Sequence, residues 1–229
     1  MDINVLERST VVSLSAREIE DFKQLAKCIN MKPGQMIFQE DESAQFVYLI
    51  ASGYVKIFRC SPLGEVVTVG IRNKGDVMGV AEVLSGINRR CFAEVLEASE
   101  LWKMEGKSFI EMLYKNPALA VKVTTVLGTR LREAEQTILN LVTLEVDRRL
   151  AKLLIDLAQK HPALGEKGLK INLKLTQQEL ATMIGTCRQT VTTTLQKFKS
   201  EGLINSGKKS IEIINMEGLK NFADSKVLT

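Results

Sequence analysis

The sequence of 229 residues is poor in the side chains that build metal sites and hydrolytic centres. It contains one histidine, His161, and no C-x-x-C pair of cysteines, so we expect no zinc, iron–sulfur or haem site. The motifs G-x-S-x-G and H-E-x-x-H are absent. The segment Gly202–Lys209 departs from a phosphate-binding loop, because Lys209 replaces the Ser or Thr that holds Mg²⁺. These absences argue against an enzyme.

Long apolar runs are missing as well. No stretch of about 18 apolar residues occurs, which excludes a membrane span. The start of the sequence, Met1-Asp2-Ile3-Asn4, lacks the charged region and apolar run of a secretory signal. The four cysteines, Cys28, Cys60, Cys91 and Cys187, are scattered along the chain and are interpreted as free thiols. We therefore expect a cytoplasmic protein.

The net charge of +4 is small, but the charges are unevenly distributed. Acidic residues crowd the beginning of the chain: Glu18, Glu20, Asp21, Glu40, Asp41 and Glu42. Lysines collect in the last quarter: Lys197, Lys199, Lys208, Lys209 and Lys220. This asymmetry fits a C-terminal region that faces a nucleic acid, although lysines on a solvated face give the same pattern.

Short strands are expected between about Gln35 and Glu105. Residues 46–50, 54–58 and 66–71 are rich in β-branched and aromatic side chains, and turn signals that contain glycine separate them. A short helix over Ala16–Cys28 precedes these strands. Strands this short, with no long helix between them, predict an antiparallel β-barrel or sandwich.

From Asn116 onward the periodicity becomes that of helices. Apolar and small residues recur at alternating steps of four and three residues: Ala120, Thr124, Leu127, Leu131, Ala134, Ile138 and Leu141. This heptad stripe predicts the seam of a two-stranded coiled coil. We expect the dimer interface to contain Leu127, Leu131, Ala134, Ile138 and Leu141. A helix packing on its own barrel would produce the same stripe, so both interpretations stay open.

The chain after this stripe predicts a helix-turn-helix. An amphipathic helix starts at Asp147 and ends near His161, and residues 162–170 are the most loop-like segment between helices. Two more helix starts follow, because Thr176-Gln-Gln-Glu179 and Thr186-Cys-Arg-Gln189 both have the spacing of a capping box. Gly185 ends the first of these helices, and two helices joined by a tight turn with glycine form a helix-turn-helix.

The second of these helices has a polar face that an ordinary solvated helix lacks. Its inward residues are Val191, Leu195 and Phe198, and its outward residues are Gln189, Thr192, Thr193 and Gln196. Threonines are poor helix formers, but their short hydroxyl groups approach the edges of bases closely, and Arg188 at the start of the helix has the fork that pairs with guanine. Free amides at Thr186 and Cys187 would hold a phosphate.

A β-hairpin wing is expected to follow, with a turn at residues 206–209 and a strand at residues 210–214. Its turn places Lys208 and Lys209 where they would contact the DNA backbone. The predicted DNA-binding residues are thus Arg188, Gln189, Thr192, Thr193, Thr176, Thr186, Lys208 and Lys209.

The segment from Leu175 to Val191, LTQQELATMIGTCRQTV, resembles the winged helix-turn-helix of the cyclic-AMP receptor and fumarate–nitrate regulator (Crp/Fnr) family. Gly53, Gly64 and Gly75-Asp-Val-Met-Gly79 match the sensor barrel of that family, and the heptad helix matches its dimerisation helix, so the resemblance covers nearly the whole chain. It implies an α+β fold. Residues 1–115 would form an effector-sensing antiparallel β-barrel of the cyclic-nucleotide-binding, jelly-roll kind, residues 116–146 the dimerisation helix, and residues 147–229 the winged helix-turn-helix DNA-binding domain.

The resemblance also bears on the bases that are read. In the family, the residues at the positions of Arg188, Gln189 and Thr193 face bases. The cyclic-AMP receptor has Arg, Glu and Arg there, whereas this sequence has Arg, Gln and Thr. A guanine contact is therefore expected at Arg188, and the rest of the DNA site is left open.

The sensor segment departs from that of cyclic-AMP sensors. Val80 stands where a Glu would hold the ribose, and Arg90 stands where a Ser is expected after Arg89. Ala134 and Glu135 replace the pair of hydroxyls that would hold adenine, and a buried Glu135 would repel a cyclic phosphate. We therefore do not expect cyclic AMP.

The same segment is similar to that of the cyanobacterial nitrogen regulator, a 2-oxoglutarate sensor of this family. The arginines and the glutamate of its ligand site correspond to Arg89, Arg130 and Glu135, and two guanidinium groups in one pocket suit a dicarboxylate. The implied effector site is Gly79, Val80, Ala81, Glu82, Val83, Arg89, Arg90, Arg130 and Glu135. An ion pair of Arg130 with Glu135 or Glu82 at the dimer interface would explain the same residues, so another effector, or none, stays open.

The predicted function is a homodimeric transcriptional regulator that binds a palindromic DNA site. Its expected partners are double-stranded DNA, a second copy of the chain and RNA polymerase, and its expected small-molecule effector is 2-oxoglutarate or a similar organic anion, without a metal. Two alternatives are a regulatory module that acts through protein contacts and a regulator that needs no ligand. The polar face of the second helix argues against the former.

Overall fold

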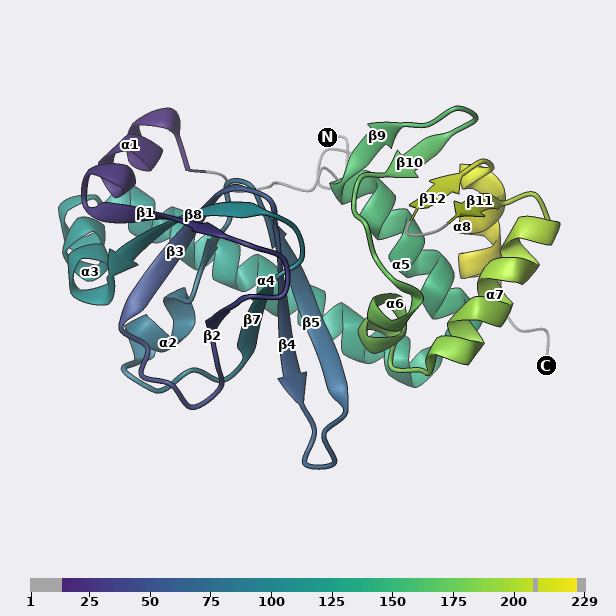
Figure 1. Ribbon diagram of the computed structural model, residues 1–229, viewed down its shortest axis with the longest axis horizontal. Coiled ribbons are helices and arrows are strands. Elements are labelled where there is room, and N and C mark those ends of the chain that lie inside the picture. The colour runs from purple at the N-terminus through teal and green to yellow at the C-terminus, as the bar shows by residue number, and fades with distance from the viewer. Residues whose placement is uncertain (1–13, 208–209, 226–229) are drawn as a thin grey trace, which may run out of the picture. The chain divides into compact units, whose positions relative to one another are not determined.

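The computed structural model describes residues 14–207 and 210–225. The contacts between residues divide the chain into two compact units, one that extends to Ala134 without Val66–Thr68 and one that comprises Glu135 onward with Val66–Thr68. The first unit is a β-barrel with helices, and the second combines helices with a small sheet (Figure 1).

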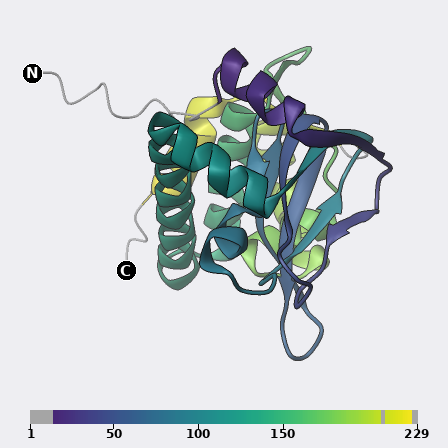
Figure 2. The ribbon, with the colours of Figure 1, turned by 90° about the vertical axis from the view of Figure 1, so that its left-hand side faces the viewer.

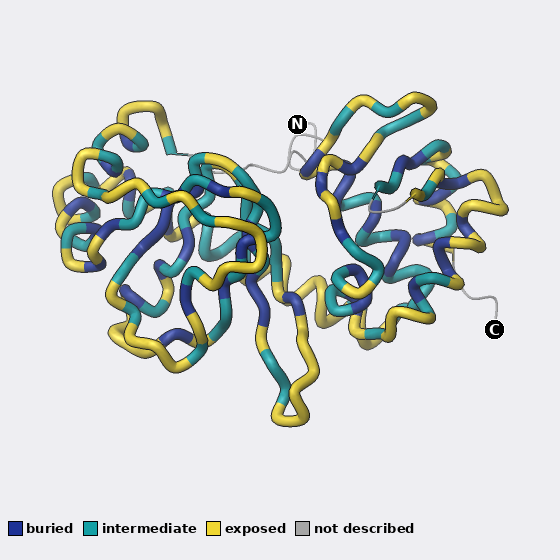
Figure 3. Tube along the Cα trace, in the orientation of Figure 1, coloured by how far each residue is buried: buried dark blue, intermediate teal, exposed yellow. Residues whose placement is uncertain are grey.

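Two four-stranded sheets form the barrel, with strand orders β1-β8-β3-β6 and β2-β7-β4-β5. The strands are β1 (Ala26–Met31), β2 (Met36–Phe38), β3 (Phe46–Ser52), β4 (Tyr54–Cys60), β5 (Val66–Asn73), β6 (Val77–Met78), β7 (Phe92–Val95) and β8 (Ser99–Glu105). Strand β3 pairs antiparallel with both β8 and β6. Buried apolar residues of the strands form a core cluster, and buried stretches of the strands are dark blue in Figure 3. The predicted antiparallel barrel is confirmed.

The helices of this unit are α1 (Ala16–Gln24), α2 (Val80–Ser85), α3 (Gly106–Lys115) and the first part of α4 (Pro117–Thr143). In Figure 2, α4 runs beside the strands and α3 crosses in front of them. The expected helix over Ala16–Cys28 is too long by four residues. It ends at Gln24 because the next residues pair with β8 as strand β1, and Cys28 lies opposite Trp102 in that ladder.

Helix α4 has two environments along its length. Near its start, Leu119 and Val123 are buried in the core of the barrel, and Leu127 packs against the same core. From Leu131 onward the apolar side chains are open to solvent in the single chain. Leu131 and Ile138 are each 61% exposed, and Leu141 is 43% exposed. Of the predicted stripe, Leu127 packs on the barrel of its own chain, and the coiled-coil seam stays a prediction for the exposed residues that follow.

The second unit contains the last part of α4, then α5 (Val146–Lys160), β9 (Pro162–Leu164), β10 (Leu169–Ile171), α6 (Gln177–Ile184), α7 (Arg188–Ser200), β11 (Ile204–Gly207), β12 (Ser210–Ile213) and α8 (Met216–Asp224). Its sheet has the order β11-β12-β10-β9. The wing hairpin is confirmed, with Gly207 opposite Ser210. The loop expected at residues 162–170 is instead a hairpin, because β10 finds a partner in β12.

None of the helices in residues 14–207 and 210–225 combines the length and the apolar composition needed to cross a bilayer.

Candidate nucleic-acid interface and effector pocket

Helix α6 begins with the predicted capping box. The Thr176 amide donates to Glu179 Oε2 (2.5 Å), and the Glu179 amide donates to Thr176 Oγ1 (3.1 Å). The Thr176 hydroxyl also donates to Glu179 Oε2 (2.7 Å). The box fixes the start of α6, and it occupies the Thr176 hydroxyl that the sequence offered to DNA.

The second predicted box, at Thr186-Cys-Arg-Gln189, is wrong. Gly185 ends α6 in the left-handed region (φ 64°), and the Thr186 amide closes that turn by donating to Ala181 O (3.1 Å). Helix α7 therefore starts one residue later than expected, at Arg188, with Cys187 as its N-cap. The Cys187 thiol lies 3.2 Å from the Thr190 hydroxyl, and this hydrogen bond, followed by those of nearby backbone amides, lowers the Cys187 pKa.

Helix α7 has the two faces that its sequence predicts. Val191, Leu195 and Phe198 are buried, and the Phe198 ring meets the Phe222 ring of α8 edge to face at 5.1 Å between centroids. Thr194 is also buried, which the sequence interpretation did not assign. These contacts fix the rotation of α7 about its own axis.

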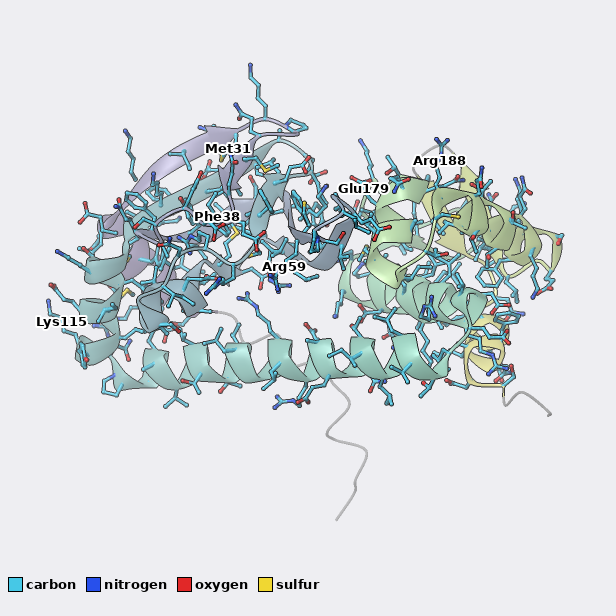
Figure 4. The ribbon with its side chains drawn as sticks, turned by 90° about the horizontal axis from the view of Figure 1, so that it is seen from below. Met31, Phe38, Arg59, Lys115, Glu179 and Arg188 are labelled. Atoms are coloured by element: carbon cyan, nitrogen blue, oxygen red, sulfur yellow. The ribbon has the colours of Figure 1, made fainter. Side chains whose placement is uncertain are left out.

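The opposite face of α7 is polar and open. Arg188, Gln189, Thr193 and Gln196 are exposed there, and Figure 4 shows Arg188 at the start of α7 near Glu179 of the neighbouring helix. Thr192 on this face is half-buried, and its hydroxyl donates to Gln177 Oε1 of α6 (2.5 Å). Thr192 therefore joins α6 to α7. The side chains of this face that remain accessible are those of its exposed neighbours.

Glu212 of strand β12 supports the wing, a role that the sequence interpretation missed. Its side chain is buried, and Oε1 accepts hydrogen bonds from the amides of Lys167 (2.5 Å) and Gly168 (2.8 Å) in the β9–β10 turn. A charged residue between Ile211 and Ile213 was the available signal, since a carboxylate on the inner face of a strand needs donors. The predicted contacts Lys208 and Lys209 lie outside the described residues.

In the sensor segment, Gly79 is left-handed (φ 74°) and starts α2, which carries buried Val80 and Val83. Arg89 is fully buried beside this turn. Its guanidinium donates to the carbonyl oxygens of Gly79 (2.8 Å) and Phe46 and contacts Glu82 Oε2 at 3.4 Å. Among the described residues, Arg89 Nε has no hydrogen-bond partner. Ala81, Arg90 and Glu135 are exposed.

Arg130 occupies a different place. From α4 it donates to Val77 O (2.8 Å) and to Asp76 Oδ1 (3.3 Å). Burial, with the neighbouring Arg72 charge, lowers the pKa of Arg130 to about 10. It lines a pocket whose other walls are Leu14, Gly75, Asp76, Val77, Val80, Lys122, Val123, Val126 and Leu127.

The two arginines therefore do not meet in the single chain, contrary to the expected pair of converging guanidinium groups. Arg89 is held by backbone carbonyls inside the barrel, Arg130 lines the pocket, and Glu135 is exposed and absent from the pocket lining. Within the chain, Arg130 pairs with Asp76, and the ion pair with Glu82 or Glu135 at a dimer interface stays a prediction. In residues 14–207 and 210–225, no group of three side chains is placed to hold a metal ion.

Comparisons with known proteins match both units. Residues 28–116 match the model of the cyclic nucleotide-binding domain, and residues 148–222 match that of the Crp-like helix-turn-helix domain. The global nitrogen regulator of Nostoc sp. (strain PCC 7120) is 30% identical over 179 residues, 77% of this chain and 80% of that protein. A CRP-like cAMP-activated global transcriptional regulator of Mycobacterium tuberculosis is 28% identical over 191 residues, 83% and 85% of the two chains. The solved structure of a CooA mutant from Carboxydothermus hydrogenoformans, 23% identical, superposes with a TM-score of 0.76 over 89% of this chain and 90% of that one.

Proposed function

The chain belongs to the Crp/Fnr family of transcriptional regulators, and from this premise we propose that it binds a palindromic DNA site as a homodimer under the control of a small organic anion. The proposal divides the chain into a sensor barrel (1–115), a dimerisation helix (116–146) and a DNA-binding domain (147–229). It places the protein in the cytoplasm and gives it RNA polymerase as a further partner.

The observation that carries the proposal is the open face of α7. Arg188, Gln189 and Thr193 are exposed on one side of a helix whose other side is anchored in the core of its unit. A helix held in this way presents its side chains to the major groove in a fixed orientation, which is what the reading of bases requires. Arg188 heads this face, and its guanidinium has the two donors that match O6 and N7 of guanine.

The test starts from a DNA site selected in vitro with the purified full-length protein. Arg188→Ala should then lower affinity for this site by about 1–3 kcal/mol and remove the preference at one base pair, with the other preferences kept. Lys208→Ala is the matched variant, because a phosphate contact should weaken all sequences alike and flatten the salt dependence. An Arg188→Ala protein with the wild-type base preferences would refute the assignment.

The homodimer is supported by the exposed half of α4. Leu131, Ala134, Ile138 and Leu141 follow the heptad spacing and are open in the single chain. A second copy of the same helix would bury them and set two recognition helices about 34 Å apart, one turn of DNA. Ile138→Asp should convert the dimer to a monomer in sedimentation velocity, whereas Lys115→Asp, on an exposed site of α3, should not.

The anion effector is supported by the pocket at Arg130. The side chain of Arg130 is 20% exposed, and its pocket is otherwise largely apolar. Val80 is buried at the position where a polar ribose contact would be needed, which disfavours a cyclic nucleotide. A thermal-shift titration should show stabilisation by 2-oxoglutarate at millimolar concentration and its loss in Arg130→Ala. The absence of any shift in the wild-type protein would overturn 2-oxoglutarate as the effector.

A further inference from the structure

The pocket at Arg130 is lined by a second cation, Lys122. Lys122, Val126 and Arg130 line it from α4 at steps of four residues, so they share one face of the helix. The Cα atoms of Lys122 and Arg130 are therefore about 12 Å apart at 1.5 Å per residue. Between the two cations the walls are apolar, with Leu14, Val80 and Val123 among them. The pocket is thus largely apolar and has two cationic side chains, about two helical turns apart, on its α4 wall.

Each cation is already neutralised by a carboxylate of the chain itself. Lys122 Nζ lies 2.7 and 2.9 Å from the two carboxylate oxygens of Glu18 in α1. Arg130 lies 3.3 Å from Asp76 Oδ1. The cavity that Lys122 and Arg130 help to line is only about 20 Å³, which is room for about one water. A ligand therefore enters by displacing these side chains.

Glu18 is the more deeply buried of the two carboxylates. It is 6% exposed, and it also accepts a hydrogen bond from the Ser15 amide (2.6 Å) at the start of α1. Burial raises the pKa of Glu18, but the hydrogen bonds from Lys122 and Ser15 outweigh burial, so that its pKa is lowered overall. A buried carboxylate that loses its cation is costly, because the charge is then unpaired in a region with little water.

We propose that this pocket binds a dicarboxylate whose two ends replace Glu18 at Lys122 and Asp76 at Arg130, and that the displaced Glu18 releases α1 from the barrel. The inference rests on the anion effector proposed above and adds its second anchor and its mechanical consequence. An exchange of one carboxylate for another leaves both cations paired, whereas a neutral ligand offers no such exchange. A monocarboxylate satisfies only one end.

The fluorescence of Trp102 would report the release of α1. Lys23 of α1 lies over the ring of Trp102, 5.4 Å from its centroid, and Trp102 is the single tryptophan of the chain. Loss of the Lys122–Glu18 pair leaves Phe22 as the apolar anchor of α1, with its ring edge to face against Phe109. Glu18 and Phe22 lie on the same face of α1, so the loss of the ion pair loosens this face and Lys23 leaves the indole ring. Trp102 emission should change when ligand binds.

The experiment titrates full-length protein with glutarate and with butyrate, by calorimetry and by Trp102 emission. Lys122→Met should weaken glutarate binding at least 10-fold and leave butyrate nearly unchanged. Glu18→Gln should strengthen glutarate binding several-fold, because it removes the carboxylate that competes for Lys122. This gain should vanish in the double variant Glu18→Gln with Lys122→Met. Lys122→Arg, which keeps the positive charge, should bind glutarate like the wild type. It shows that the loss in Lys122→Met comes from the missing charge and not from misfolding. Lys115→Met, on an exposed site of α3, is the control and should bind like the wild type.

The outcomes separate this inference from the function on which it rests. Glutarate binding that needs Arg130 but is unaffected in Lys122→Met would overturn the second anchor and leave the effector proposal standing. Binding without a change in Trp102 emission would overturn the release of α1. No binding of glutarate to the wild-type protein would overturn both the inference and the anion effector, while the DNA-reading face would stay testable through Arg188→Ala.

Discussion

Glu212 is a buried carboxylate whose removal should loosen the wing of the DNA-binding unit. Its Oε1 atom accepts two backbone hydrogen bonds from the β9–β10 turn, from Lys167 and Gly168, and joins that turn to strand β12. Hydrogen bonds to a charged group each contribute about 1.5–3 kcal/mol. Glu212→Ala removes both of them, but the amides lie in a turn that water reaches, so we expect a loss of about 3 kcal/mol in local stability.

Glu212→Gln is the finer perturbation, since both bonds end on one oxygen and the amide keeps an oxygen there. It removes the charge and should cost about 1 kcal/mol, the difference between a charged and a neutral hydrogen bond. Glu166→Gln is the matched control, because Glu166 is exposed in the same turn.

Hydrogen exchange of the full-length protein measures this effect directly. A loss of 3 kcal/mol in the free energy of local opening raises the exchange rate about 100-fold. The increase should appear in β9–β10 and β11–β12 and should be absent from α7. Protection within twofold of the wild type in Glu212→Ala, or an equal loss in Glu166→Gln, would refute the role given to the buried carboxylate.

Two further predictions concern the thiols and the sensor turn. Iodoacetamide at pH 7 should modify Cys187, whose pKa is lowered, well before Cys91, whose pKa burial raises to about 11. The thiolate is the reacting form, and a lower pKa gives more thiolate. Peptide mass spectrometry measures the order of modification, and equal rates at the two cysteines would contradict the prediction. Gly79→Ala should destabilise the barrel more than Gly86→Ala. Both glycines have positive φ (74° and 65°), with a cost of about 1–2 kcal/mol for alanine, but only at position 79 would the new Cβ lie 2.7 Å from the Arg89 guanidinium. Thermal unfolding followed by tryptophan fluorescence compares the stability of the two variants. Equal losses of stability would show that the Arg89 side chain moves aside without cost.

The sequence by itself determined the features that depend on near neighbours. The β-branched runs at residues 46–50, 54–58 and 66–71 became β3, β4 and β5, because the alternation of side chains along a strand is local. The buried and exposed faces of α7 followed from helical spacing, and the capping box at Thr176 followed from residues three apart. The fold and the polar, exposed face of α7 were predictable for this reason.

The tertiary structure alone decided the features whose partners are distant in the chain. Arg89 and Arg130 are equivalent as sequence, yet one donates to Phe46, 43 positions away, and the other to Asp76, 54 positions away. Glu212 finds its donor 45 positions away at Lys167. Spacing along the sequence carries no information on such pairs, since the barrel and the small sheet bring them together only after folding. The same physics acts along α4: Leu119, Val123 and Leu127 pack on the barrel, whereas Leu131, Ile138 and Leu141 are exposed in the single chain.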